Sequence, residues 1–290
     1  MKSGSSEPLI FIFMEKYRLF AYDLDGTLLA TDKNLPEENR RALAEAYKKG
    51  NILVPATGRI YLGISELIRN MGVSRYYICC NGAVVLDAET GETIYSADLP
   101  LEDALKISDH ICSQFDAAWG CYQDGRGFMS SEDRANLAHF FEDKFMLDYI
   151  LSAHSGVPDF RGMLIRKGRG MHKCSFYFAD KAERQYCLET LPKLFPHIKF
   201  TSSVPNNIEC NSFQADKGLA LNALCSFLGI PEASSVAFGD GTNDIAMLKA
   251  AGLGVAMANA PDEVKASADI TADTNDNAGV GKMILSLIEA

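Results

Sequence analysis

The 290-residue sequence lacks an excess of positive charge and has no long apolar run. Lys and Arg number 28 against 38 Asp and Glu, so the formal net charge is −10 and the pI is near 5.0. Nucleic-acid backbones and anionic membrane surfaces are therefore unfavourable main partners. The apolar stretch at residues 9–14 is too short to span a bilayer or to form a signal peptide. A small anionic substrate would need positive charge gathered locally.

Short paired cysteine spacings, which zinc sites require, are also missing. The eight cysteines lie inside apolar runs, which is typical of buried free thiols in a reducing compartment. We therefore expect a cytoplasmic protein. We also expect residues 1–14 to be an N-terminal extension, with Met14 a candidate natural start.

The sequence does contain an alternating pattern of short apolar segments, typical of strands, and amphipathic segments, typical of helices. Residues 19–22, 52–56 and 76–80 are continuously apolar, and helix patterns at 36–49 and 62–71 separate them. Strands without alternation are typical of a parallel sheet that is covered on both faces. The sequence therefore predicts an α/β fold with a doubly wound, mostly parallel, Rossmann-like core sheet.

The rhythm changes in the middle of the chain. Hairpin patterns at 84–98 and 120–130 and a helix pattern at 101–112 indicate an α+β unit. Strand–helix order returns after Asp216. We therefore predict a catalytic core made from residues 15–86 and 201–290, with an α+β cap inserted at 87–200 that sets substrate specificity.

Polar residues follow each predicted core strand directly. They are Asp23-Leu24-Asp25-Gly26-Thr27, Thr57-Gly58-Arg59, Asn81-Gly82 and Gly239-Asp240-Gly241-Thr242-Asn243-Asp244, and Asp216-Lys217-Gly218 begins a helix. Ligands bind at the carboxyl ends of the strands in such sheets, so these groups are expected at one edge.

A cluster of carboxylates has a limited chemistry. Two like charges about 4 Å apart repel by roughly 4 kcal/mol at an effective dielectric near 20, so several acids together raise their pKa values or bind a cation. Oxygen ligands without His or Cys nearby favour Mg²⁺ over zinc. Lys217 and the amides of the glycine-rich turns supply donors that a phosphoryl group needs. The pattern therefore predicts a phosphate site.

These motifs, in this order, resemble the haloacid dehalogenase superfamily of phosphohydrolases. The wording Asp-Leu-Asp-Gly-Thr-Leu-Leu at residues 23–29 and the large insert resemble the Cof-type branch with a type-2 cap. The resemblance implies that Asp23 is the nucleophile and forms an aspartyl-phosphate. It implies that Asp25 is the acid and base, and that Lys217 neutralises phosphate and orients Asp23.

The resemblance also implies a set of phosphate-binding residues. Thr57 and the Gly58 amide would hold phosphate oxygens, and Asn81 and Gly82 would line the phosphate loop. Asn243 would position either the lysine or the phosphate. Arg59 is as consistent with a surface or gate position as with a phosphate ligand, and we leave it out of the catalytic set.

A metal site is implied as well. Asp240 would bind Mg²⁺ directly, together with Asp23 and the backbone carbonyl of Asp25, and Asp244 would support the metal. Taken alone, the acids at 23 and 25 would indicate only a capped turn, but the other motifs make that interpretation weak.

Three functions follow from this pattern. We favour a Mg²⁺-dependent phosphatase for small phosphorylated metabolites, sugar phosphates first. A phosphomutase on sugar phosphates and a non-catalytic protein that senses phosphometabolites are the alternatives. The basic residues at 161–169 are either a solvated loop or an attractive entrance for anionic substrates. The oligomeric state does not follow from the sequence.

Overall fold

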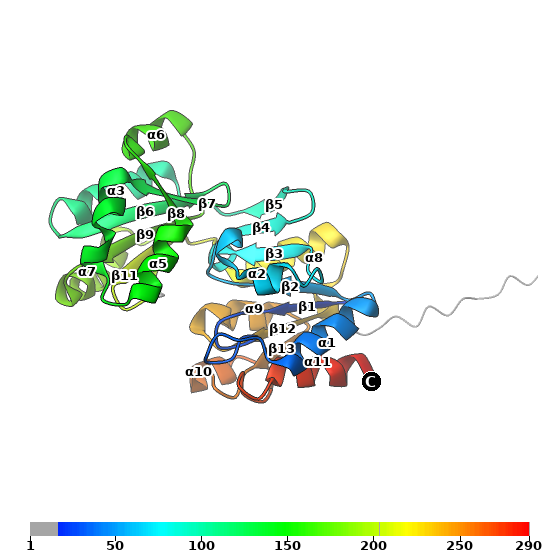
Figure 1. The fold of residues 1–290 in the computed structure, drawn as a ribbon. Helices are drawn as coiled ribbons and strands as arrows, with labels where there is room; N and C mark the ends of the chain where they lie inside the picture. The colour runs from blue at the N-terminus through cyan, green and yellow to red at the C-terminus, as the bar shows by residue number, and fades with distance from the viewer. Residues whose placement is uncertain (1–16, 203, 290) are drawn as a thin grey trace, which may run out of the picture.

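The computed structural model describes residues 17–202 and 204–289, so the predicted extension at 1–14 lies outside the described residues. Two bodies make up this part of the chain. The core contains both ends of the described sequence, and the middle forms a separate cap (Figure 1). None of the helices in the described ranges has the length and apolarity to cross a bilayer.

The core is built on a parallel sheet in the order β14-β13-β12-β1-β2. Its strands are β1 (Leu19–Tyr22), β2 (Ile52–Pro55), β12 (Ser235–Gly239), β13 (Leu253–Ala256) and β14 (Ile270–Thr271). An antiparallel sheet, β3 (Tyr76–Cys79), β4 (Val84–Asp87) and β5 (Thr93–Ser96), continues from it through a parallel bridge between Ala56 and Ile78.

Helices cover both faces of this sheet. Phe20 and Tyr22 of β1 pack in one apolar cluster and Leu19 and Ala21 in another, because successive side chains of a strand point to opposite faces. The main helices are α1 (Glu37–Lys48) and α11 (Gly279–Glu289) on the first side, and α8 (Lys217–Leu228), α9 (Ile245–Ala250) and α10 (Asp262–Lys265) on the second. The short elements are α2 (Glu66–Arg69), η1 (Tyr61–Gly63), η2 (Cys80–Gly82), η4 (Glu232–Ser234) and η5 (Thr242–Asp244). The predicted fold class is confirmed.

The cap is a mixed sheet in the order β10-β11-β9-β6-β7-β8, with helices on it. Its strands are β6 (Ala117–Gln123), β7 (Arg126–Ser130), β8 (His154–Val157), β9 (Lys173–Phe178), β10 (Ile198–Thr201) and β11 (Asn207–Ser212). Its helices are α3 (Leu101–Cys112), α4 (Ser131–Asn136), η3 (Leu137–Phe140), α5 (Lys144–Ala153), α6 (Phe160–Lys167) and α7 (Lys181–Leu194).

Sheet membership bears on where the cap begins and ends. β5 pairs with β4 beside the core, whereas β10 and β11 pair with each other and with β9 in the cap sheet. We therefore propose that the chain enters the cap near residue 97 and leaves it near 213. This moves both junctions about ten residues later than the predicted 86/87 and 200/201 boundaries.

The basic segment at 161–169 differs from its predicted interpretations. Most of it is helix α6, which lies at the end of the cap remote from the core sheet (Figure 1). Its cations pair with cap carboxylates: Arg161 with Asp109 at 2.6 Å and Arg166 with Asp159 at 2.8 Å. The hypothesis of an entrance for anionic substrates at this segment was wrong, since local acids neutralise its charge far from the core.

Candidate active site

Four loops meet at the carboxyl edge of the core strands, as the sequence predicts. Asp23 follows β1, Thr57 follows β2 by one residue, Asn81 lies in η2 after β3, and Asp240 follows β12. The β12–β1–β2 order places the first, second and fourth of these loops side by side. Lys217 is the first residue of α8.

Lys217 joins two carboxylates in the interior. Its Nζ lies 2.6 Å from Oδ1 of Asp23 and 2.6 Å from Oδ1 of Asp244. The lysine is 0% exposed and Asp23 only 7%. Burial raises the pKa of Asp23 to about 7, with Asp244 adding to the rise and Lys217 opposing it. Burial would lower the pKa of Lys217, but the two carboxylates outweigh this and raise it. Asp23 and Asp244 therefore hold the charged ammonium of Lys217 at a fixed place beside Asp23.

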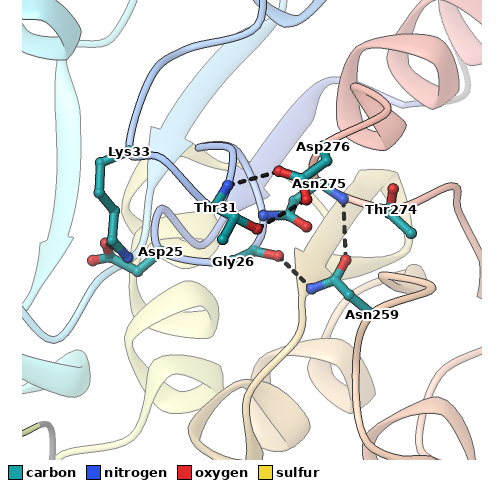
Figure 2. A pocket seen from close by; sticks show the side chains of 8 residues that line it. All are labelled: Asp25, Gly26, Thr31, Lys33, Asn259, Thr274, Asn275 and Asp276. Atoms are coloured by element: carbon teal, nitrogen blue, oxygen red, sulfur yellow. Dashed lines mark hydrogen bonds and ion pairs between the residues drawn. The ribbon is translucent and has the colours of Figure 1, made fainter.

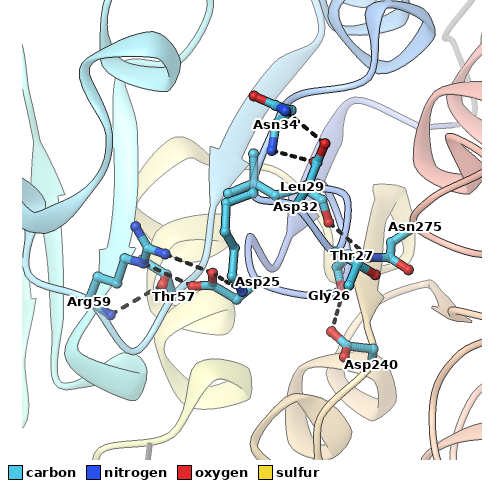
Figure 3. Close-up of polar contacts among 12 residues, drawn as sticks. Asp25, Gly26, Thr27, Leu29, Asp32, Asn34, Thr57, Arg59, Asp240 and Asn275 are labelled. Atoms are coloured by element: carbon cyan, nitrogen blue, oxygen red, sulfur yellow. Dashed lines mark hydrogen bonds and ion pairs between the residues drawn. The ribbon is translucent and has the colours of Figure 1, made fainter. Parts of the chain in front are cut away.

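The loop after β1 leaves the strand through Gly26, whose φ is +87°. A side chain there would displace Asp240, because a Cβ would lie 2.3 Å from Oδ2 of that residue. Thr27, which follows, donates a hydrogen bond of 2.6 Å to Oδ1 of Asp240 (Figure 3). The close approach of Asp240 to the β1 loop thus depends on the glycine and the threonine together.

The acids form a set that fits a divalent cation. Asp23, Asp240 and Asp244 each offer a carboxylate oxygen, and these oxygens lie within 4.8 Å of one another. Burial raises the pKa of Asp240, and the neighbouring Asp244 adds to this. A cation would relieve that repulsion, and an all-oxygen donor set suits Mg²⁺. The residues present therefore fit the metal that the sequence implies.

Asp25 has a different environment from the other acids. Arg59 donates to both of its carboxylate oxygens, at 2.9 and 2.7 Å (Figure 3). Lys33 donates to Oδ1 at 3.0 Å. Burial alone would raise the pKa of Asp25, but the guanidinium and the ammonium more than offset it, and the pKa lies below its usual range. Asp25 is therefore a carboxylate held by two cations in this structure.

The residues predicted to bind phosphate are brought together around η2. The hydroxyl of Thr57 accepts from the backbone N–H of Arg59 at 3.2 Å (Figure 3). A Cβ on Gly58 would lie 2.6 Å from Oδ1 of Asn81, so the two loops touch. Asn243 donates to Asn81 at 3.3 Å. It is Asp244, not Asn243, that contacts the lysine.

Gly82 connects this loop to the start of α8. Its φ is +90°, and a Cβ would lie 2.3 Å from the carbonyl carbon of Asp216 and 2.5 Å from the backbone nitrogen of Lys217. The N-cap of α8 is Asp216, which accepts from the N–H groups of Gly218 and Leu219 at 2.8 and 3.1 Å. The η2 loop and the Asp216 N-cap together determine where the Lys217 side chain begins at the start of α8.

An open pocket of about 350 Å³ lies beside Asp25 on the core side (Figure 2). It is lined by Asp25, Gly26, Thr31, Lys33, Asn259, Thr274, Asn275 and Asp276. Asp276 accepts from the N–H and the hydroxyl of Thr31 at 2.7 and 2.9 Å, and Asn259 donates to the carbonyl of Gly26 at 2.8 Å. The loops after β13 and β14 thus brace the loop that carries Asp25.

Sequence reasoning left Arg59 out of the catalytic set and missed three other charged residues near the site. Arg59 and Lys33 are the partners of Asp25, and Lys173 of β9 and Glu209 of β11 reach the site from the cap. The sequence contains a weak indication of Lys173 and Glu209, because each charged residue lies next to apolar residues whose pattern is compatible with a β-strand. That pattern predicts a buried ion pair only once the two strands are known to be neighbours.

The comparisons with known proteins agree with this geometry. Residues 20–284 match the haloacid dehalogenase-like hydrolase family. The 5-amino-6-(5-phospho-D-ribitylamino)uracil phosphatase YcsE of Bacillus subtilis is 33% identical, over 92% of this chain and 94% of that protein. Phosphatase YwpJ of the same organism is 31% identical, over 93% and 100%. A haloacid dehalogenase-like hydrolase from Bacteroides thetaiotaomicron has a similar structure, with a TM-score of 0.76, 28% identity and coverage of 94% and 100%.

The chain therefore belongs to the haloacid dehalogenase-like hydrolase family. The resemblance expected from the sequence is confirmed. Both Bacillus subtilis relatives, which match 92% and 93% of this chain, are phosphatases by name, and the chain is a phosphoric monoester hydrolase.

Proposed function

We propose that the protein is a Mg²⁺-dependent phosphatase of small phosphorylated metabolites, with sugar and polyol phosphates preferred, and that it acts through an aspartyl-phosphate. The observation that carries this proposal is the buried contact of Lys217 with Asp23, beside a cluster of acids that fits a cation. The relative YcsE is named for a substrate with a phosphoribityl group, which is a polyol phosphate. The eight free cysteines support a cytoplasmic location.

In the first proposed step, a carboxylate oxygen of Asp23 attacks phosphorus and the bond from phosphorus to the leaving oxygen breaks. That oxygen takes a proton from Asp25. Arg59 and Lys33 hold Asp25 ionised in the free protein, but a dianionic phosphate would draw these cations to itself and raise the pKa of the acid.

In the second step, water attacks phosphorus and gives its proton to Asp25, and the bond from phosphorus to Asp23 breaks. Lys217 neutralises the phosphoryl group, and the Thr57 hydroxyl and the Gly58 N–H donate to its oxygens. When bound by Asp23, Asp240, the Asp25 carbonyl and the supporting Asp244, Mg²⁺ supplies positive charge against the developing charge on the phosphoryl oxygens.

The test is trapping of the intermediate. With ³²P-labelled p-nitrophenyl phosphate, whose leaving group departs without a proton from Asp25, and an acid quench, Asp25→Ala should retain label on the protein, because the second step lacks its base. Asp23→Asn should retain none and should release no inorganic phosphate from p-nitrophenyl phosphate. Asp262→Asn, at an exposed acid in α10, is the matched control and should turn over normally. Turnover that survives Asp23→Asn would contradict the proposal.

A further inference from the structure

One face of the cap sheet is apolar, and the other is polar along part of β9 and β11 and apolar where Ala118 and Tyr177 pack. Cys174 and Phe176 of β9 and Cys210 of β11 belong to the apolar cluster beneath the cap helices. The residues that alternate with them are polar, yet they are also buried: Lys173 and Ser175 on β9, and Glu209 and Asn211 on β11. Since successive side chains point to opposite faces of a strand, these polar groups share the other face.

This polar face lies on the loops of the core site. Lys173 donates from Nζ to the carbonyl oxygen of Gly58 at 3.1 Å, and Asn81 donates to Oε2 of Glu209 at 3.3 Å. Asn211 donates to the carbonyl of Cys80 at 3.3 Å. The cap therefore meets the core at Gly58 and Asn81, two of the residues proposed to surround the phosphate.

Lys173 and Glu209 form a buried ion pair at this junction. Nζ of Lys173 lies 2.7 Å from Oε1 of Glu209, and each side chain is 6% exposed. The ammonium also lies 5.1 Å from the ring centroid of Tyr122. Burying two charges is costly, and an apolar pair of similar size often packs at least as well. A buried ion pair between a cap and an active-site loop therefore indicates a task beyond packing.

We propose that Lys173 and Glu209 together contact the leaving group and select phosphate esters that carry hydroxyl groups but no second negative charge. This inference rests on the proposed phosphatase function, because it concerns the same site. An ammonium has three N–H donors, and Glu209 and Gly58 use two of them. A hydroxyl can accept from the ammonium and donate to the carboxylate, so one neutral group can contact both members of the ion pair. A second negative group on the substrate would lie close to the carboxylate of Glu209 as well as to the ammonium, and electrostatic repulsion would disfavour binding of that substrate.

A matched pair of substrates tests the assignment. Sorbitol 6-phosphate and 6-phosphogluconate differ only at the far carbon, which is a hydroxymethyl group in one and a carboxylate in the other. The wild type should prefer the first. Glu209→Gln removes the negative charge and leaves the ammonium uncompensated, so the ratio of kcat/KM for 6-phosphogluconate to that for sorbitol 6-phosphate should rise by about tenfold or more.

The control is another ion pair of the cap. Asp109 pairs with Arg161 at 2.6 Å on the exposed side of the cap, and Asp109→Asn should leave the ratio unchanged. If Glu209→Gln does not fold, Lys173→Gln gives the test with the opposite sign, since it leaves the carboxylate alone and should lower the ratio. A ratio that neither variant moves would overturn the assignment while the phosphatase function stood. A wild type that hydrolyses no phosphate ester would overturn the proposed function itself.

Discussion

Asp25 and Asp23 are two residues apart and have opposite electrostatic environments. Arg59 and Lys33 lower the pKa of Asp25 below its usual range, whereas burial raises that of Asp23 to about 7. In the free protein this order is the reverse of what a nucleophile at Asp23 and a proton donor at Asp25 need, so a cation beside Asp23 and a phosphate beside Asp25 must invert it before the reaction. The sequence names both acids, but only the folded chain shows that Arg59 turns its guanidinium onto Asp25 instead of solvent.

Gly26 offers a test at the scale of one atom. Gly26→Ala should destabilise the protein and lower kcat by about a hundredfold or more, because the added methyl would displace Asp240, and small misplacements in an active site are that costly. Urea unfolding and p-nitrophenyl phosphate turnover measure the two effects.

Gly50→Ala separates backbone strain from the clash. Gly50 has nearly the same φ, +88°, but nothing lies within 4 Å of the position of its Cβ. This variant should lose about 1 kcal/mol of stability from the left-handed backbone and keep full activity. Equal activity in the two variants would show that Asp240 does not depend on the absent side chain.

At the scale of elements, helix α8 sets the position of Lys217, which we propose neutralises the phosphoryl group. Its N-cap, Asp216, binds two N–H groups, and Lys217 follows at once. The pattern Asp-Lys-Gly before an apolar run indicates such a helix start. The sequence also predicts the core strands well, because short, continuously apolar runs bounded by Gly and polar residues favour buried strands over helices.

Asp216→Ala should cost about 1 kcal/mol of stability because the N-cap hydrogen bonds of α8 are lost. It should also lower kcat by about tenfold or more, because Lys217 shifts. Asp180→Ala removes the equivalent N-cap of α7, where the side chain accepts from the N–H groups of Ala182 and Glu183. It should cost the same stability and no activity. Asp216→Asn keeps a capping side chain and should restore both properties. Full activity in Asp216→Ala would show that the N-cap side chain of α8 does not position Lys217.

Elements of the cap are less predictable. β11 alternates polar and apolar residues, with Asn207, Glu209 and Asn211 on one face, and such a segment resembles an exposed edge strand. It is buried because the core loops cover its polar face and supply hydrogen bonds. Local pattern cannot report this, since the partners are far away in the chain.

At the scale of the whole molecule, the acid cluster joins the two ends of the chain. Asp23 directly follows β1, and Asp240 and Asp244 come from beyond the cap in the sequence. A cation held there binds only the folded state, because the unfolded chain does not bring these acids together.

Mg²⁺ should therefore raise the melting temperature, and EDTA should reverse the rise. At a hundredfold excess of Mg²⁺ over its Kd the stabilisation should be about 2.7 kcal/mol. Asp240→Asn should lose most of this shift, and Asp109→Asn, remote in the cap, should keep it. A shift of the same size in both variants would place the bound cation elsewhere.

Local patterns were enough to predict the fold class and to place the acids and Lys217 at one edge of the sheet, because strand periodicity and strand-end motifs are read within short stretches of sequence. Tertiary structure alone decided that Arg59 holds Asp25, that Lys173 pairs with Glu209 across neighbouring cap strands, and which strands belong to the cap sheet. These depend on which distant segments become neighbours and on the burial that follows, and no single stretch of sequence records either.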